Sequence, residues 1–361
     1  MRSYYHYLFI IGTIAAILSG PPPVCAEPDT VRTQTITPYL DPAAARENTK
    51  PYRLLTRAER KDYNSTAKYY LPSSEAKRFS GKRGRIVYER MTGQHFIVGE
   101  MLSGKTARDL AKERLIYLLA AGINRAAGET MLALAEVRSV PVSAIDAPEL
   151  ARWAHRKGLQ ALTLIRSVGD YATDTSLENP FSIEAQIPFY ILTRDRDHQF
   201  AAINSVWIKK QHINISFDHD HSLRPELDAI DDFLKKKIPG ERFTGCRWCS
   251  IFYGNYILSD DQYWTYNVFI DYGIDPSRLY TLNDEKLRTY TRRISDKTIL
   301  TDRLIADSVT AAGFEGEEKE ELIFFLTKWR DNLPADLGRL IALATARQPS
   351  HGSPHPTLAA A

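Results

Sequence analysis

The sequence has little cysteine, no excess of charge of either sign and only one long apolar run. Of its 361 residues, 47 are Lys or Arg and 44 are Asp or Glu, which gives a formal net charge of +3. Proteins that bind nucleic acids usually carry a basic patch or stripe, and no basic stripe dominates this sequence. The balanced charge therefore predicts no nucleic-acid partner.

The one long apolar run, "LFIIGTIAAILSG", lies near the N-terminus and leads into "PPPVCAEP". A positive charge, an apolar stretch and small residues at Val24 and Ala26 predict a cleaved signal peptide over residues 1–26. The run is shorter than the roughly 20 residues of a membrane span. We therefore expect an exported chain, periplasmic or secreted, with no integral membrane segment after cleavage. A lipoprotein with its lipid on Cys25 is the alternative, although the residues before it do not resemble a lipobox.

The sequence contains three cysteines, and two of them, Cys246 and Cys249, form the CxxC of "GCRWC". In an oxidising compartment this spacing predicts a short structural disulfide. A redox-active pair would instead need a strand before it, a helix after it and a lowered thiol pKa. Free or metal-bound thiols are the third possibility, and the sequence leaves all three open.

Composition and pattern predict an α+β fold. Apolar residues make up 43% and aromatic residues 11% of the chain, enough for a substantial core. We expect an extended lead-in over residues 27–50, a strand and helix lobe over 51–165, a mainly helical lobe over 166–346, and a disordered tail over 347–361.

Local patterns place the main elements of the first lobe. "RGRIVYERMTGQHFIVGEM" predicts two strands around a turn at Thr92–Gly93. "TARDLAKERLIYLLAAGI" predicts a helix that ends near Gly122, and "ETMLALAEV" and "DAPELARWAHRKG" predict two more helices. "LQALTLIRSV" predicts a buried strand.

The second lobe begins with an apolar segment that ends at Thr193. A strand pair around "KKQH" follows, and then "RPELDAIDDFLKKK" predicts an amphipathic helix with acidic residues early and lysines late. The region from about 257 to 346 is largely helical by pattern.

The stretch "GEMLSGKT", from Gly99 to Thr106, matches the phosphate-binding pattern G-x-x-x-x-G-K-[ST]. In a P-loop NTPase the backbone amides and Lys105 would bind phosphates and Thr106 would hold magnesium. Such proteins continue as alternating β and α units in a parallel sheet, whereas the strand here belongs to a hairpin. The alternative is that Gly104 and Thr106 only begin the following helix.

A second pattern lies between Thr193 and Asp220. Asp195 and Asp197 follow the apolar segment in "TRDRDH", Asn204 comes 7 residues after Asp197, and Asp218 comes 14 residues after Asn204. This order resembles the catalytic loop and metal-binding Asp of the protein-kinase-like fold, and is nearest to its HipA-like and lipid-kinase-like branches. The resemblance spans roughly residues 80 to 330 and is specific only in this loop region.

The resemblance implies a small strand-rich N-lobe, a larger helical C-lobe and a nucleotide-dependent phosphotransferase that uses ATP and Mg²⁺. Asp197 would be the base, with Asp195 as its competitor, and Asn204 and Asp218 would be metal ligands. If the segment is extended, alternation places Asp220 on the face of Asp218, which makes it a further candidate ligand. The acceptor, a protein or a small molecule, is unknown.

The chain also departs from the kinase pattern. The position of the ATP-binding lysine holds Gly99 and Glu100, and Lys105 is the nearest substitute. Glu113 would be its partner, but eight residues span roughly 12 Å along a helix, so we expect no ion pair if both lie on that helix. These departures keep open a non-catalytic exported binding or scaffold protein, a pseudokinase.

The sequence lacks the motifs that are typical of two classes of hydrolase. A metal-dependent hydrolase would use His198, His219 or His221 with the nearby aspartates, but the established HExxH spacing is missing. A Ser-His-Asp hydrolase would start from G-x-S-x-G, and the sequence has none. The simplest alternative for Asp218 and Asp220 is that they cap the helix that follows.

Overall fold

The computed structural model describes residues 50–61, 63, 86–102, 104–167, 170–171, 183–195, 205–208, 213–216, 219, 222–225, 248 and 282–346. Several predicted parts lie outside these residues: the predicted signal peptide, most of the lead-in, the C-terminal tail, most of the helix predicted from "RPELDAIDDFLKKK", and Cys246 and Cys249. The segment Thr49–Ala361 forms one compact unit, to which all of the described residues belong.

A six-stranded mixed sheet forms one part of this unit, with the strand order β4-β6-β3-β2-β1-β5. Its strands are β1 (Tyr52–Leu54), β2 (Ile86–Glu89), β3 (His95–Val98), β4 (Val137–Pro141), β5 (Ile145–Asp146) and β6 (Ala161–Arg166). All neighbours pair antiparallel except β1 and β5, which are parallel. The predicted hairpin is confirmed, because β2 and β3 pair around a turn in which Gly93 has a φ of 74°.

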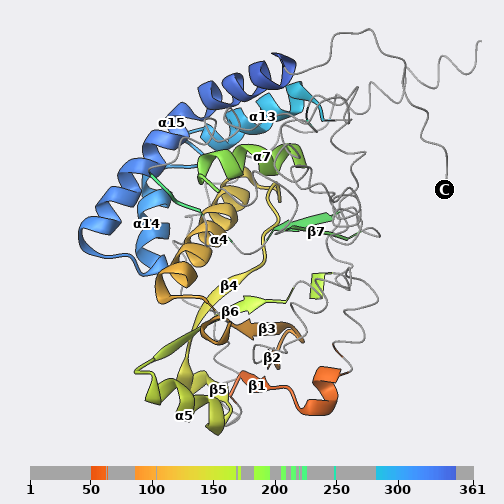
Figure 1. Ribbon diagram of the computed structural model, residues 1–361, viewed down its shortest axis with the longest axis vertical. Helices are drawn as coiled ribbons and strands as arrows, with labels where there is room; N and C mark the ends of the chain where they lie inside the picture. The colour runs from red at the N-terminus through yellow and green to blue at the C-terminus, as the bar shows by residue number, and fades with distance from the viewer. Residues whose placement is uncertain are drawn as a thin grey trace, which may run out of the picture. The chain divides into compact units, whose positions relative to one another are not determined.

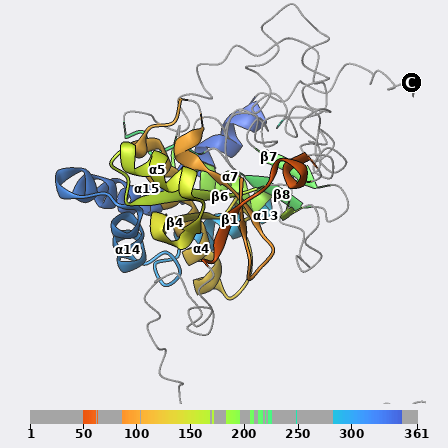
Figure 2. The same ribbon diagram turned by 90° about the horizontal axis from the view of Figure 1, so that it is seen from below.

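The sheet is curled, so that strands distant in its order touch through their side chains. Arg138 of β4 places Nη1 2.8 Å from Oε1 of Glu89 on β2, and the Tyr52 hydroxyl of β1 donates to the same oxygen at 3.0 Å. The Arg138 guanidinium also lies 4.8 Å from the ring centroid of Phe96. Burial raises the pKa of Tyr52 to about 12. Tyr52 and Phe96 also belong to a buried apolar cluster, to which helix α5 (Pro148–Arg156) adds Leu150 and Ala154. The helix is labelled in Figure 2.

The remaining helices pack against one another, with α4 between them and the sheet (Figure 1). They are α4 (Ala107–Ala127), α7 (Ile183–Leu192), α13 (Asp284–Ser295), α14 (Asp302–Ala312) and α15 (Gly316–Ala346). Together with the sheet they confirm the predicted α+β class. No helix in the described ranges is long and apolar enough to cross a membrane.

Helix α4 is longer than its sequence pattern predicted. Gly122, predicted at its C-terminus, lies inside the helix, and the helix ends instead at Gly128, which has a φ of 70°. A Cβ at Gly122 would lie 2.5 Å from Cδ1 of Leu304, so this glycine allows α14 to approach closely. The prediction was wrong because a glycine selected by packing looks the same in sequence as one that ends a helix.

The prediction of a helix from "ETMLALAEV" is also wrong. The chain from Thr130 to Glu136 is not helical. The Asn124 side chain of α4 accepts from the backbone N–H groups of Met131 and Leu132, both at 2.9 Å, and donates to the Leu132 carbonyl at 2.7 Å. These bonds satisfy backbone groups that a helix would otherwise pair internally.

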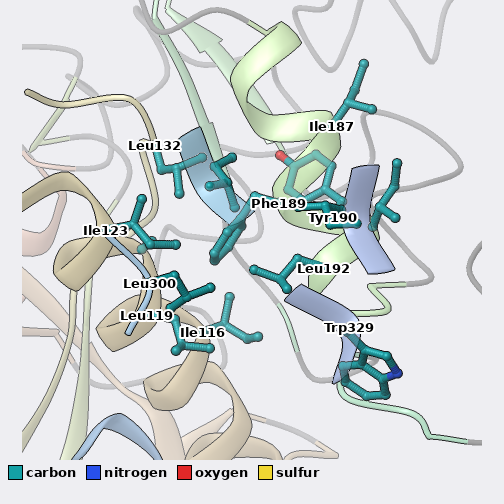
Figure 3. Close-up of a cluster of buried hydrophobic side chains, with 14 of the residues drawn as sticks. Ile116, Leu119, Ile123, Leu132, Ile187, Phe189, Tyr190, Leu192, Leu300 and Trp329 are labelled. Carbon is teal, nitrogen blue, oxygen red and sulfur yellow. The ribbon is translucent and has the colours of Figure 1, made fainter. Parts of the chain in front are cut away.

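The larger core lies between α4, α7 and the C-terminal helices. Figure 3 shows Ile116, Leu119 and Ile123 of α4 facing Phe189 and Leu192 of α7. Ten labelled residues of Figure 3 belong to this buried cluster: Ile116, Leu119, Ile123, Leu132, Ile187, Phe189, Tyr190, Leu192, Leu300 and Trp329. The packing of α7 in this core fixes the chain that follows it.

The predicted strand pair around "KKQH" is confirmed. Strands β7 (Ser205–Ile208) and β8 (Ile213–Ser216) pair antiparallel as a separate two-stranded sheet. Ile215 is buried. In the chain, this hairpin lies between α7 and the segment that begins at residue 217.

Candidate functional site

The end of α7 and the segment after β8 meet through the side chain of Asp195. This carboxylate is fully buried, and its Oδ2 lies 2.7 Å from Nδ1 of His219 and 2.6 Å from Oγ of Ser222. The Ser222 hydroxyl donates to this oxygen, and an ionised carboxylate would also accept from an imidazole that carries its proton on Nδ1. We call Asp195, His219 and Ser222 the Asp195 cluster. It joins residues 24 and 27 positions apart in sequence.

The backbone beside the cluster is strained. Arg194 has a φ of 50° and Leu223 a φ of 58°, and these are the only non-glycine residues with positive φ in the described ranges. The Leu223 N–H donates to the Thr193 carbonyl at 2.8 Å, so the two strained residues lie on adjacent segments. Such conformations cost about 1–3 kcal/mol each and cluster at functional sites. The surrounding contacts must therefore hold both segments firmly.

Arg194 supplies one of these contacts. Its guanidinium is buried, with Nη2 3.0 Å from Oδ2 of Asp336 and Nη1 donating to the Ile191 carbonyl at 2.9 Å. It also lies 5.2 Å from the ring centroid of Trp329. Asp336 and Trp329 both belong to α15, so the chain leaving α7 is anchored to the long C-terminal helix.

Lys105 and Glu113 form a buried ion pair, because the condition under which we expected none does not hold. Lys105 Nζ lies 2.8 Å from Glu113 Oε1, and the two side chains are only 10% and 3% exposed. The expectation assumed that both residues lie on one helix, but α4 begins at Ala107, with Thr106 as its N-cap. Lys105 therefore lies on the turn before the helix, where Gly104 has a φ of 87°. From there its side chain reaches Glu113 in the second turn of α4.

Thr106 is occupied as a helix cap. Its hydroxyl accepts from the Asp109 N–H at 3.2 Å and donates to Oδ2 of Asp109 at 2.7 Å, and the Thr106 N–H donates to the same oxygen at 2.8 Å. The strand before this turn, β3, pairs antiparallel on both sides. Both observations favour the helix-cap interpretation of Gly104 and Thr106 over the P-loop, which requires a parallel strand.

The other predicted site residues lie outside the described residues. They are Asp197, Asn204, Asp218 and Asp220. Asp197 comes two residues after the buried Asp195, and Asp218 and Asp220 stand on either side of the buried His219. Within the described part of the chain, no group of three or more His, Cys, Asp or Glu side chains is placed to hold a metal ion.

Sequence reasoning missed a second polar cluster, where β3 begins and β6 ends. His95 places Nδ1 2.9 Å from Oδ1 of Asp170, and its ring stacks on Tyr63 with 4.3 Å between centroids. The Tyr63 hydroxyl donates to Ser167 Oγ at 2.5 Å, and burial raises the pKa of Tyr63. No spacing in the sequence links these four residues, which come from three separate segments. For the Asp195 cluster, the alternation around His219 was the one available signal.

No protein-family model, curated protein or solved structure matches this chain. The contacts of the described residues are therefore the basis for a functional proposal.

Proposed function

We propose that this chain is an exported, Mg²⁺-assisted, nucleotide-dependent phosphotransferase of the protein-kinase-like type. The smaller lobe would comprise the six-stranded sheet with α4, and the larger lobe α7, the β7–β8 hairpin and helices α13 to α15. The observation that carries the proposal is the contact between Asp195 and His219, with 2.7 Å between Oδ2 and Nδ1. It brings together the two segments whose order in the sequence resembles a catalytic loop and a metal-binding motif.

The order of the elements supports the same proposal. A strand hairpin (β2 and β3), a helix with a buried glutamate (α4), a strand (β6) and a buried helix (α7) precede the loop. A second hairpin (β7 and β8) separates the loop from the segment that contains His219. This succession is the one that the kinase resemblance implies.

The chemistry assigns a role to each segment. Phosphoryl transfer depends mostly on positioning and charge stabilisation. Asn204 and Asp218, with Asp220 as a further ligand, would hold Mg²⁺ against the phosphates of ATP. Asp197 would accept the proton of the acceptor hydroxyl. Asp195 is less suited to that task, because it is fully buried and its Oδ2 binds two donors.

Lys105 would supply positive charge to the phosphates. The Lys105 ammonium group acts as a point charge, and Glu113, at 2.8 Å, would hold it in place. The position of Lys105 also favours a second candidate, a non-catalytic exported binding or scaffold protein of the pseudokinase type. Lys105 comes from a turn rather than from strand β3, and its side chain is only 10% exposed.

A melting experiment tests the proposal. Millimolar Mg·ATP is expected to raise the melting temperature of the wild type, and Asp218→Ala is expected to abolish the rise. Asp307→Ala is the matched control, because Asp307 is 66% exposed on α14 and its ion pair with Arg303 is long, at 3.5 Å. The absence of any rise in the wild type would contradict the proposal. A rise without transfer or hydrolysis of the γ-phosphate would identify the pseudokinase.

A further inference from the structure

We infer that His219 is a positioning residue, which sets the placement of the metal-binding segment relative to the catalytic loop by donating its Nδ1–H to Asp195. The inference rests on the proposed function and deepens it. It assigns to His219 neither contact with substrate nor metal coordination.

The geometry of the Asp195 cluster carries this inference. His219 is 3% exposed and Asp195 fully buried, so the hydrogen bond at 2.7 Å is shielded from water. Ser222 donates to the same carboxylate oxygen at 2.6 Å. Two directional hydrogen bonds on one buried oxygen fix the relative position of two segments more sharply than apolar packing does, because their strength falls steeply with distance and angle.

The position of His219 in the sequence links this bond to the proposed metal ligands. His219 stands between Asp218 and Asp220. The bond that holds His219 therefore acts on a residue that is covalently linked to both proposed ligands.

The strained backbone supports a positioning role over a purely space-filling one. Leu223 and Arg194 both have positive φ, and the Leu223 N–H donates to the Thr193 carbonyl. Strain of this kind persists only where neighbouring contacts over-determine the conformation. Asp195 directly follows Arg194 and Ser222 directly precedes Leu223, so the two hydrogen bonds of the Asp195 cluster are among the contacts that join the two strained segments.

Three substitutions separate hydrogen bonding from packing. His219→Asn keeps an N–H donor at the position of Nδ1, whereas His219→Leu keeps an apolar side chain of intermediate size without a donor. Ser222→Ala removes only the second donor and changes the side-chain volume least. The dissociation constant of ATP with and without Mg²⁺, the γ-phosphate hydrolysis rate and the free energy of unfolding are measured for each folded variant.

Residues that orient metal ligands typically contribute about 10- to 100-fold in metal affinity or activity. We therefore expect His219→Leu to weaken Mg·ATP binding or slow hydrolysis by about 10- to 100-fold, and Ser222→Ala to act in the same direction with a smaller effect. ATP binding without Mg²⁺ should change little in either variant, and His219→Asn should recover most of the loss.

Two results overturn the inference while leaving the proposed function intact. One is wild-type affinity and hydrolysis in both His219→Leu and Ser222→Ala. The other is an equal loss in folded His219→Asn and His219→Leu, because the donor would then be irrelevant. If His219→Leu does not fold, Ser222→Ala decides alone, with unchanged Mg·ATP affinity and hydrolysis as the overturning result. A wild type that binds no nucleotide would instead overturn the proposed function, and this inference with it.

Discussion

Lys105 and Glu113 are eight residues apart in the sequence, yet Nζ of the lysine lies 2.8 Å from Oε1 of the glutamate. The contact arises because Thr106 is the N-cap of α4, so that Lys105 lies outside the helix. Its side chain can then lie beside the first two turns of the helix and reach Glu113. A buried pair of this kind is costly to break from one side, since the remaining charge is left without its partner in a poorly solvated site.

The first prediction concerns this pair. Lys105→Met or Glu113→Gln should each lower the free energy of unfolding by about 3 kcal/mol, as measured by urea denaturation. The double variant Lys105→Met/Glu113→Leu should cost clearly less than the sum of the two single changes. The exposed pair of Lys297 and Asp331 is the control, with side chains 67% and 40% exposed and 2.9 Å between Nζ and Oδ2. Lys297→Met should cost less than about 1 kcal/mol, and equal losses at both sites would contradict the buried pair.

The second prediction concerns the pH dependence of stability. Burial raises the pKa of Glu100, whose ordinary value is 4.5. Its Oε1 accepts from the Thr163 N–H at 2.7 Å, and its buried Oε2 has no hydrogen-bond partner among the described residues. Because the folded-state pKa is the higher one, this group's contribution to stability is fully present below pH 4.5 and is lost as the pH rises through the raised pKa.

Glu100→Gln should therefore gain stability relative to the wild type as the pH rises from 4 to 8. The difference should be constant below the unfolded-state pKa, since the wild-type carboxyl is then protonated in both states. Chemical denaturation across this pH range measures the effect, and Glu320→Gln, at an exposed position, controls for the loss of a carboxylate. A difference that does not change with pH would show that Glu100 is not perturbed by burial.

The third prediction separates the two interpretations of Thr106. As a helix cap, Thr106→Ala should lower the free energy of unfolding by about 1 kcal/mol, and Thr106→Ser should be nearly neutral. Neither variant should change the affinity for Mg·ATP. Loss of nucleotide affinity in Thr106→Ala, measured by calorimetry on folded protein, would restore the P-loop interpretation.

The fourth prediction concerns the segment after α4. Asn124→Ala removes three side-chain hydrogen bonds to Met131 and Leu132 and leaves their backbone groups unpaired. We expect a loss of about 2–4 kcal/mol in the free energy of unfolding. Asn124→Asp keeps an acceptor for the two N–H groups and loses only the donor, so it should cost less. Equal losses would show that the two N–H bonds contribute little.

The same asparagine illustrates what the sequence could and could not predict. The β2–β3 hairpin followed from alternating residues around Gly93, and the presence of α4 from its apolar spacing, because local pattern decides both. The chain from Thr130 to Glu136 carries an apolar spacing compatible with a helix, but Asn124 satisfies its backbone from another element. Contacts between distant elements of this kind leave no periodic signal.

The candidate site divides along the same line. The sequence could predict that Asp195 follows an apolar segment and that the acidic segment around His219 follows a strand pair. The bond between them could not, because its geometry depends on where α7 and the β7–β8 hairpin lie in space. Likewise the Lys105–Glu113 distance depended on a single residue, the one at which α4 begins.

The most direct test of the central claim places Fe²⁺ in the Mg²⁺ site with ATP, adds ascorbate and peroxide, and maps where the locally generated radicals cut the chain. The account predicts cuts in both segments, between residues 195 and 204 and between residues 217 and 221, that require nucleotide and are suppressed by excess Mg²⁺. Cuts confined to other parts of the chain, or to one of the two segments, would contradict a metal–nucleotide site held between them.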